Sequence, residues 1–305
     1  MKYYFQNLKF IAKLSFFVYN ENNKEEILKV FDIHLHIGHL FQWKENAIKL
    51  WMDTGDYREK IFDKNGRLII DNYVEVLAKE GVVAGVLLPE YSPMTAGVLP
   101  VEETVKFQEK YPQFLAFGAV NPNVHIDPLK EFKRQLDLGV KGLKLHSVHG
   151  LYFINDSRLY PLYQYCEDNH IPVMLHAGTS IFKGTRLRHA DPYTFDDVAT
   201  DFPELTIILC HAGRGFWYHI AEFLIRRHKN VYIDVSGLPP KNLLKYYPSM
   251  GRLSHKFIFG TDFPGVPGVK KNIDAINELP ISAEAKERIF YKNAVNLLKI
   301  NFKEI

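Results

Sequence analysis

The sequence contains little cysteine and no long apolar run, and these scarcities set the first limits on its class. Only two cysteines occur in 305 residues, and Cys166 and Cys210 do not form a Cys-x-x-Cys pair. A disulfide framework is therefore excluded, and a reducing, cytoplasmic setting is expected. No apolar stretch approaches the roughly 18 residues that a membrane span requires, so we expect a protein without a membrane partner.

The sequence also lacks a strong excess of charge of either sign. Lys and Arg number 38 against 35 for Asp and Glu, which gives a formal net charge of +3. The basic residues are scattered among acidic ones and form no block of like charge. Nucleic acid binding depends on a concentration of positive charge. The charge balance therefore argues against nucleic acid as a partner.

From residue 31 onward, short β-rich apolar runs alternate with longer amphipathic stretches, which is typical of βα units around a parallel sheet. The sequence contains eight such runs, at residues 31–36, 83–89, 114–121, 141–146, 172–178, 205–212, 231–236 and 256–262. Eight parallel strands predict closure into a (β/α)8 TIM barrel, an α/β fold. A chain of 305 residues, 47% of them hydrophobic, suits one such domain.

Helical spacing of apolar residues predicts helices between the strands, at residues 67–79, 127–138, 158–169, 216–228 and 269–279. Ser282 is the expected N-cap of a last helix over residues 282–300. Residues 1–30 form a predicted N-terminal extension that precedes the barrel domain, residues 31–305. Residues 39–65 are an insertion after the first strand, rich in aromatic and charged residues. This insertion could cover the active site, form a dimer contact or simply pack on the surface.

Several predicted strands end in polar residues, although inward-facing barrel positions are normally apolar. In the run DIHLH, His34 and His36 are two residues apart, so on a strand both project from the same face and can bind one metal ion. The histidine pair alone also fits ordinary polar packing. Three further runs end in ligand-type residues, namely His176, His211 and Asp262. Five such groups at one end of a barrel indicate a divalent-metal site.

The segments at the strand ends resemble the amidohydrolase superfamily in their order and position. They read FDIHLHIG, GVKGLKLH, VMLHAGT, ILCHAG, VYIDVSG and IFGTDFP, and YKNAVNLL follows near the end. The resemblance covers residues 31–299 and is strongest to the amidohydrolase-related (amidohydrolase 2) branch, which includes aminocarboxymuconate-semialdehyde decarboxylase. It implies one divalent ion, with zinc the first choice, and a homodimer as a further expectation. The metal ligands that it implies are His34, His36, His176 and Asp262, and His211 matches the histidine that helps to activate water.

Physical chemistry agrees with these roles. A divalent ion lowers the pKa of bound water to about 7 and polarises a substrate carbonyl. Asp262 can accept the proton from that water and pass it to the leaving group, while His211 can orient the water or stabilise oxyanion charge. A competing interpretation of Asp262 is a helix N-cap before Pro264.

The predicted function is hydrolysis of an amide, ester or lactone bond of a small acidic molecule. The alternative is non-oxidative decarboxylation of an unsaturated or aromatic acid, which the same ligands serve.

Lys144 complicates the number of metal ions, because it ends the fourth predicted strand on the same face as His146. A buried ammonium group beside a metal ion is electrostatically costly. In some members of the superfamily a lysine at this strand is carbamylated and bridges two ions, so a binuclear site with carbamylated Lys144 is an alternative to one ion. Lys144 could also bind an acidic substrate or pair with a carboxylate. His146 is accordingly a candidate for second-metal or substrate binding, and His149 either contacts substrate or belongs to a hydrogen-bonded loop.

Arginine recognises carboxylates through a planar, two-pronged geometry. Arg214, shortly after His211, is therefore a predicted substrate-binding residue and suggests an acidic substrate. Arg186 and Arg188 follow the fifth strand. They could also border the cavity, but solvated loop positions explain them equally well. Strand alternation predicts that Cys210 faces outward, into the helix layer.

Overall fold

The computed structural model describes residues 29–300 of the chain. Apart from its last two residues, the predicted N-terminal extension lies outside the described residues. Among residues 29–300, no helix combines the length and the apolar character that crossing a bilayer requires.

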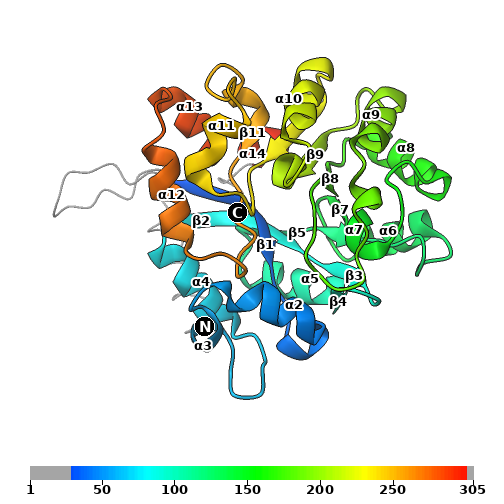
Figure 1. Cartoon of the computed structure of the whole chain (residues 1–305). Coiled ribbons are helices and arrows are strands. Elements are labelled where there is room, and N and C mark those ends of the chain that lie inside the picture. Colours follow the sequence, from blue (N-terminus) through cyan, green and yellow to red (C-terminus); the bar gives the residue numbers. More distant parts are fainter. Residues whose placement is uncertain (1–28, 301–305) are drawn as a thin grey trace.

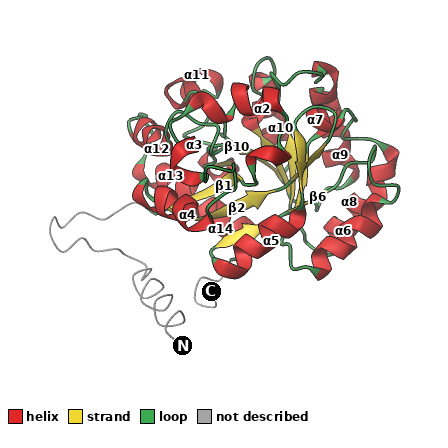
Figure 2. Ribbon diagram, turned by 90° about the horizontal axis from the view of Figure 1, so that it is seen from below, coloured by secondary structure: helices red, strands yellow, loops and turns green. Residues whose placement is uncertain are grey.

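Parallel strands form the wall of a (β/α)8 barrel, with the helices arranged around it (Figures 1 and 2). The strands are β1 (Val30–His36), β2 (Val82–Leu88), β5 (Phe114–Ala116) continued by β6 (Gly118–Ala119), β7 (Leu143–Leu145), β8 (Val173–His176), β9 (Ile207–Cys210), β10 (Val231–Asp234) and β11 (Phe257–Ile258). Each pairs with the next in parallel. The Ile33 N–H donates to the Phe259 carbonyl at 3.0 Å, which joins the first strand to the last segment and closes the barrel. All eight predicted strands are confirmed.

The helices cover the outside of the barrel (Figures 1 and 2). The longer ones are α4 (Ile70–Lys79), α5 (Val101–Lys110), α6 (Pro128–Asp137), α8 (Tyr160–Asp168), α9 (Pro192–Asp201), α10 (Tyr218–Arg227) and α12 (Val269–Asn277). Shorter turns are α7 (Ser147–Gly150), η3 (Ser157–Leu159), η4 (Leu187–Ala190), η5 (His211–Gly213), η6 (Pro240–Asn242), α11 (Leu243–Tyr246) and η7 (Ser254–Lys256). The amphipathic spacing predicted α4, α6, α8, α10 and α12 to within a few residues, whereas no range was predicted for α5 and α9.

The predicted last helix is interrupted. It comprises α13 (Ala283–Glu287), a π-helical turn η8 (Arg288–Lys292) and α14 (Asn293–Leu297). The Ile289 carbonyl accepts the Phe259 N–H at 2.8 Å, and this tertiary bond competes with the regular helical bond of that carbonyl. Ser282 is the N-cap, as predicted, because its Oγ accepts the Ala285 N–H at 3.1 Å.

Replacing Ser282 by alanine is expected to lower the free energy of unfolding by about 1 kcal/mol, because one N–H of the first helical turn loses its acceptor. Urea unfolding followed by circular dichroism measures this change. Ser157→Ala is the matched control, since Ser157 is exposed in a short helical turn whose cap is Asp156. That variant should differ from the parent by less than about 0.5 kcal/mol. Equal destabilisation by the two changes would contradict the capping role of Ser282.

The insertion after β1 packs against the hairpin that follows β2. It holds η1 (Leu40–Gln42), α2 (Glu45–Leu50), η2 (Met52–Thr54) and α3 (Arg58–Ile61). After β2 the chain forms a hairpin of β3 (Glu90–Ser92) and β4 (Gly97–Leu99). Lys44 donates its N–H to the Ala96 carbonyl at 2.7 Å, and a Cβ on Gly97 would lie 2.3 Å from the Gln42 carbonyl oxygen. Glycine at this position therefore allows the insertion and the hairpin to meet closely.

The prediction that Cys210 faces the helix layer is wrong. Cys210 is buried with Ile208 and Met174 in the apolar set inside the barrel. Its sulfur also lies within 4.8 Å of ligand atoms of His34 and Asp234. The prediction extended strand alternation to His211, but the strand ends at Cys210 and His211 has φ +64°. A left-handed turn, and not the pleat, therefore directs the His211 side chain.

Candidate metal centre

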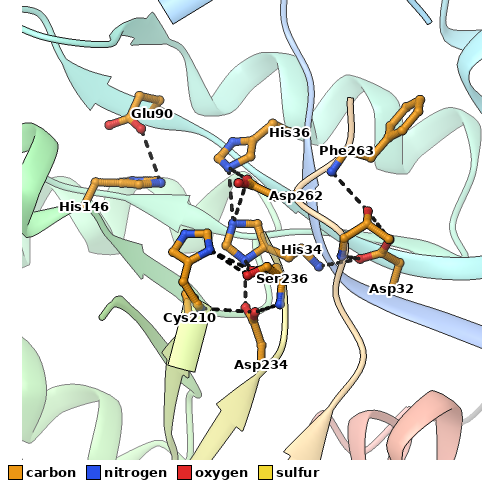
Figure 3. A network of polar contacts seen from close by, with 12 residues as sticks. Asp32, His34, His36, Glu90, His146, Cys210, Asp234, Ser236, Asp262 and Phe263 are labelled. Atoms are coloured by element: carbon orange, nitrogen blue, oxygen red, sulfur yellow. Dashed lines mark hydrogen bonds and ion pairs between the residues drawn. The ribbon is translucent and has the colours of Figure 1, made fainter. Parts of the chain in front are cut away.

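His34, His36 and Asp262 bring three ligand atoms together at the carboxyl end of the barrel strands (Figure 3). The two Nε2 atoms of the histidines lie 3.3 Å apart. Asp262 Oδ1 lies 3.4 Å from the Nε2 of His34 and 3.3 Å from that of His36. Ligands at about 2.0–2.1 Å from a tetrahedral zinc ion lie about 3.3–3.4 Å from one another. The three atoms therefore match one face of a zinc tetrahedron.

Asp234 sets the tautomer of His34. Its Oδ2 lies 2.7 Å from His34 Nδ1, so the proton stays on Nδ1 and the Nε2 lone pair faces Asp262 and His36. Burial, followed by the charge of Lys144, lowers the pKa of His34 to about 4, so the ring is neutral at pH 7. Burial opposes ionisation of Asp234, but His34 nevertheless holds the pKa of that carboxyl below its usual value. A neutral, oriented imidazole is the form that binds a metal ion.

His176 and His211 complete the group that the sequence placed at the strand ends. Their ring centroids lie 4.5 Å apart, and the His211 ring lies 4.8 Å from that of His34. Burial lowers the pKa of both rings. The Nε2 of His176 is buried without a hydrogen-bond partner, which is costly unless another group satisfies it. His211 Nδ1 lies 3.1 Å from the Ser236 carbonyl, so it donates there and leaves its Nε2 lone pair available.

Another buried carboxylate, Asp32, joins the first strand to the turn that carries Asp262. Its oxygens accept the Thr261 hydroxyl at 2.6 Å and the Thr261 N–H at 3.1 Å. Burial raises the pKa of Asp32 to about 7. Asp262 itself has φ +73°, a conformation uncommon for residues other than glycine. The side chain of Asp262 is thus held toward the histidine pair by backbone geometry that no strand pattern reveals.

Lys144 is fully buried on β7. Its Nζ has no hydrogen-bond partner among the described residues. Lys144 pairs in register with Met174, which belongs to the apolar set inside the barrel, so Lys144 lies on the inner side of the barrel, as predicted. Carbamylation of Lys144 stays an untested alternative to the single ion.

A cavity of about 310 Å³ opens beside these groups. Its wall includes the predicted residues His36, His146, His176, His211, Arg214 and Asp262. The insertion contributes Trp43 and Trp51, whose rings lie 5.9 and 5.1 Å from that of His36. This position agrees with the covering role among the alternatives for the insertion.

The three candidate arginines lie in different places, and only Arg214 lines the cavity. Arg214 Nη1 lies 4.0 Å from Asp262 Oδ2, and its Nη2 donates to the Thr179 carbonyl at 2.7 Å. Arg186 and Arg188 are exposed and do not line the cavity, in agreement with the solvated-loop interpretation. Arg214 is therefore the arginine placed to meet an acidic group in the cavity.

Besides Asp32, two buried carboxylates near the cavity, Asp234 and Glu90, received no role from the sequence. Asp234 ends the apolar run of β10, and Glu90 follows that of β2 after one proline. Both positions carry the same signal as Asp262, an acidic residue at the end of an apolar strand. Glu90 lies 3.3 Å from His146 Nε2 and 3.1 Å from His149 Nδ1.

Replacing Asp234 by asparagine is expected to weaken divalent-metal affinity about 10- to 100-fold, because His34 loses the carboxylate that orients its ring. Competition with a chromophoric chelator measures the affinity. Asp127→Asn is the matched control, since Asp127 caps α6 far along the chain and its side chain accepts only the Lys130 N–H at 2.9 Å. Unchanged affinity in Asp234→Asn would show that Asp234 does not position His34 for metal binding.

Comparison with known proteins gives the family. A sequence model described as amidohydrolase matches residues 31–300. A search of curated proteins found no match. Among solved structures, an uncharacterised TIM-barrel protein from Bordetella bronchiseptica is similar at 24% identity and a TM-score of 0.75, covering 89% of this chain and 99% of that one.

Two further similar structures carry enzyme names. A 2,6-dihydroxybenzoate decarboxylase from Rhizobium has 18% identity and a TM-score of 0.62, with 89% of this chain and 98% of that chain covered. A 4-oxalomesaconate hydratase from Rhodopseudomonas palustris has 17% identity and a TM-score of 0.59, with 88% and 95% covered. These likenesses show the shared barrel fold. With the family match over residues 31–300, the chain belongs to the amidohydrolase family of enzymes.

Proposed function

We propose that this protein is a metal-dependent hydrolase that acts on an amide, ester or lactone bond of a small organic acid. In this proposal one zinc ion is bound by His34, His36, His176 and Asp262. The observation that carries it is the triangle of His34 Nε2, His36 Nε2 and Asp262 Oδ1, with separations of 3.3–3.4 Å. The unpartnered Nε2 of His176 in the same cavity supports a fourth ligand.

A bound divalent ion would polarise a substrate carbonyl and lower the pKa of a water molecule to about 7. Asp262 would accept the proton of the attacking water and return it to the leaving group. Its second oxygen, Oδ2, lies 4.0 Å from Arg214 Nη1. His211 would accept a hydrogen bond from the attacking water through Nε2, since its Nδ1–H is held by the Ser236 carbonyl. Arg214 would bind the acidic group of the substrate.

The aromatic wall of the cavity favours a second candidate function, decarboxylation of an unsaturated or aromatic acid. Trp43, Trp51 and Phe182 line the cavity and offer flat faces to a planar molecule. A similar solved structure is also named as a decarboxylase, although at 18% identity it informs only the fold. We prefer hydrolysis because the roles proposed for Asp262, binding the ion and carrying a proton from water to a leaving group, are the roles that hydrolysis requires.

A panel of small lactones, esters, amides and unsaturated or aromatic acids separates the two functions. The zinc-loaded protein is expected to release protons from an ester or lactone, or an amine from an amide, without producing CO2. CO2 production without net hydrolysis would replace hydrolysis by decarboxylation. The Asp262→Asn variant, assayed on the same panel, shows whether any turnover comes from this site.

A further inference from the structure

Glu90, His146 and His149 form a second cluster of potential ligands on another part of the cavity wall. Glu90 begins the short hairpin after β2, whereas both histidines follow β7, in and just before α7. Their exposed fractions are 1%, 4% and 7%. One oxygen, Glu90 Oε2, lies 3.3 Å from His146 Nε2 and 3.1 Å from His149 Nδ1, and Figure 3 shows His146 directed at Glu90. Two imidazoles thus converge on a single carboxylate oxygen.

The cluster has no cationic partner of its own. Among residues 29–300, no lysine or arginine forms an ion pair with Glu90. A buried carboxylate without a positive partner is costly. His146 Nε2 is also buried and has no hydrogen-bond partner among residues 29–300. A cation between these atoms would satisfy both groups at once.

The spacing and the outer contacts fit a small divalent ion. The three ligand atoms lie within 4.8 Å of one another, and the two measured separations are close to the about 3.3 Å expected around a tetrahedral ion. Ser92 donates its hydroxyl to Glu90 Oε1 at 2.5 Å, which turns Oε2 toward the histidines. Ser180 Oγ lies 3.1 Å from His149 Nε2 and can accept its proton, which would leave the Nδ1 lone pair for a metal ion.

We propose that Glu90, His146 and His149 form a second divalent-cation site, separate from the site of His34, His36, His176 and Asp262. Two histidines and one carboxylate on one face leave coordination positions open toward the cavity. The ring centroids of His36 and His146 lie 5.9 Å apart, so both sites border the same space. The role of the second ion rests on the proposed function: it would bind an anionic group of the substrate.

Counting bound metal tests the inference without an activity assay. Metal-free protein is equilibrated with Co²⁺ or Zn²⁺, unbound metal is removed, and metal per folded chain is determined by elemental analysis. The parent should bind two ions, and Glu90→Gln and His149→Ala should each bind one. The double change His34→Ala with His36→Ala should also leave one, because it disrupts only the first site. Circular dichroism and melting curves confirm that each variant is folded.

The outcomes separate failure of this inference from failure of the proposed function. One ion in the parent, one in both Glu90→Gln and His149→Ala, and none in the double histidine variant would overturn the second site and leave the first intact. One ion in the parent, none in Glu90→Gln and one in the double histidine variant would overturn the first site and support the second. Two ions retained by both Glu90→Gln and His149→Ala would also overturn the assignment of these ligands.

Discussion

Replacing Asp262 by asparagine should lower kcat of the zinc-loaded protein by about 10²- to 10⁴-fold, the range over which a positioned acid–base group contributes. Asparagine keeps the shape of the side chain and an oxygen that can still lie near His34 and His36. Its amide cannot accept a proton, however, so the transfer from water to leaving group is lost. Steady-state kinetics on the substrate found in the panel, with the metal content of each sample determined, measures the change.

Asp191→Asn is the control for Asp262→Asn, because Asp191 caps α9 by accepting the Tyr193 N–H at 3.1 Å and does not line the cavity. Its kcat should stay within twofold of the parent. If the fall in kcat of Asp262→Asn is fully explained by lost metal, Asp262 acts only as a metal ligand. A fall in kcat with metal still bound would support its proton-transfer role. Unchanged kcat in Asp262→Asn would refute that role.

The barrel and the histidine pair were accessible from sequence because both depend on local periodicity. Alternating apolar runs located each strand, and a spacing of two placed His34 and His36 on one face, which the 3.3 Å Nε2 separation confirms. Strand ends meet at one end of a parallel barrel, so ligand-type residues at those ends could be grouped without coordinates. The strand order along the chain therefore predicts that His176 and Asp262 lie close to His34 and His36.

The remaining parts of the site depend on backbone conformations and contacts that lack a periodic signal. His211 and Asp262 lie in turns with positive φ, so strand alternation does not predict the directions of their side chains. The turn at His211 also explains why the predicted direction of Cys210 is wrong. Glu90 and His149 are 59 residues apart and meet only because the β3–β4 hairpin lies against α7. Such a contact is fixed by tertiary packing and not by spacing along the chain.

Removing the metal should lower the thermal stability of the protein, and returning zinc should restore it. Without an ion, the His34 Nε2 lone pair lies 3.3 Å from His36 Nε2, and the buried Nε2 of His176 has no hydrogen-bond partner among the described residues. Binding to the folded state alone adds RT ln(1 + [L]/Kd), or about 2.7 kcal/mol at a free zinc concentration of 100 Kd. Melting curves at fixed pH, with chelator and then with buffered zinc, measure the effect.

The double change His34→Ala with His36→Ala provides the control for metal removal, because it deletes two ligands of one site and leaves Glu90, His146 and His149 in place. Its zinc-dependent stabilisation should be smaller than that of the parent, and any remainder should disappear on adding Glu90→Gln. The dependence on pH has a definite sign: the ligand imidazoles must be neutral, so zinc stabilises less as pH falls and protons compete for them. Equal melting temperatures of the metal-free and zinc-loaded parent would contradict both sites, since an ion bound only to the folded protein must stabilise it.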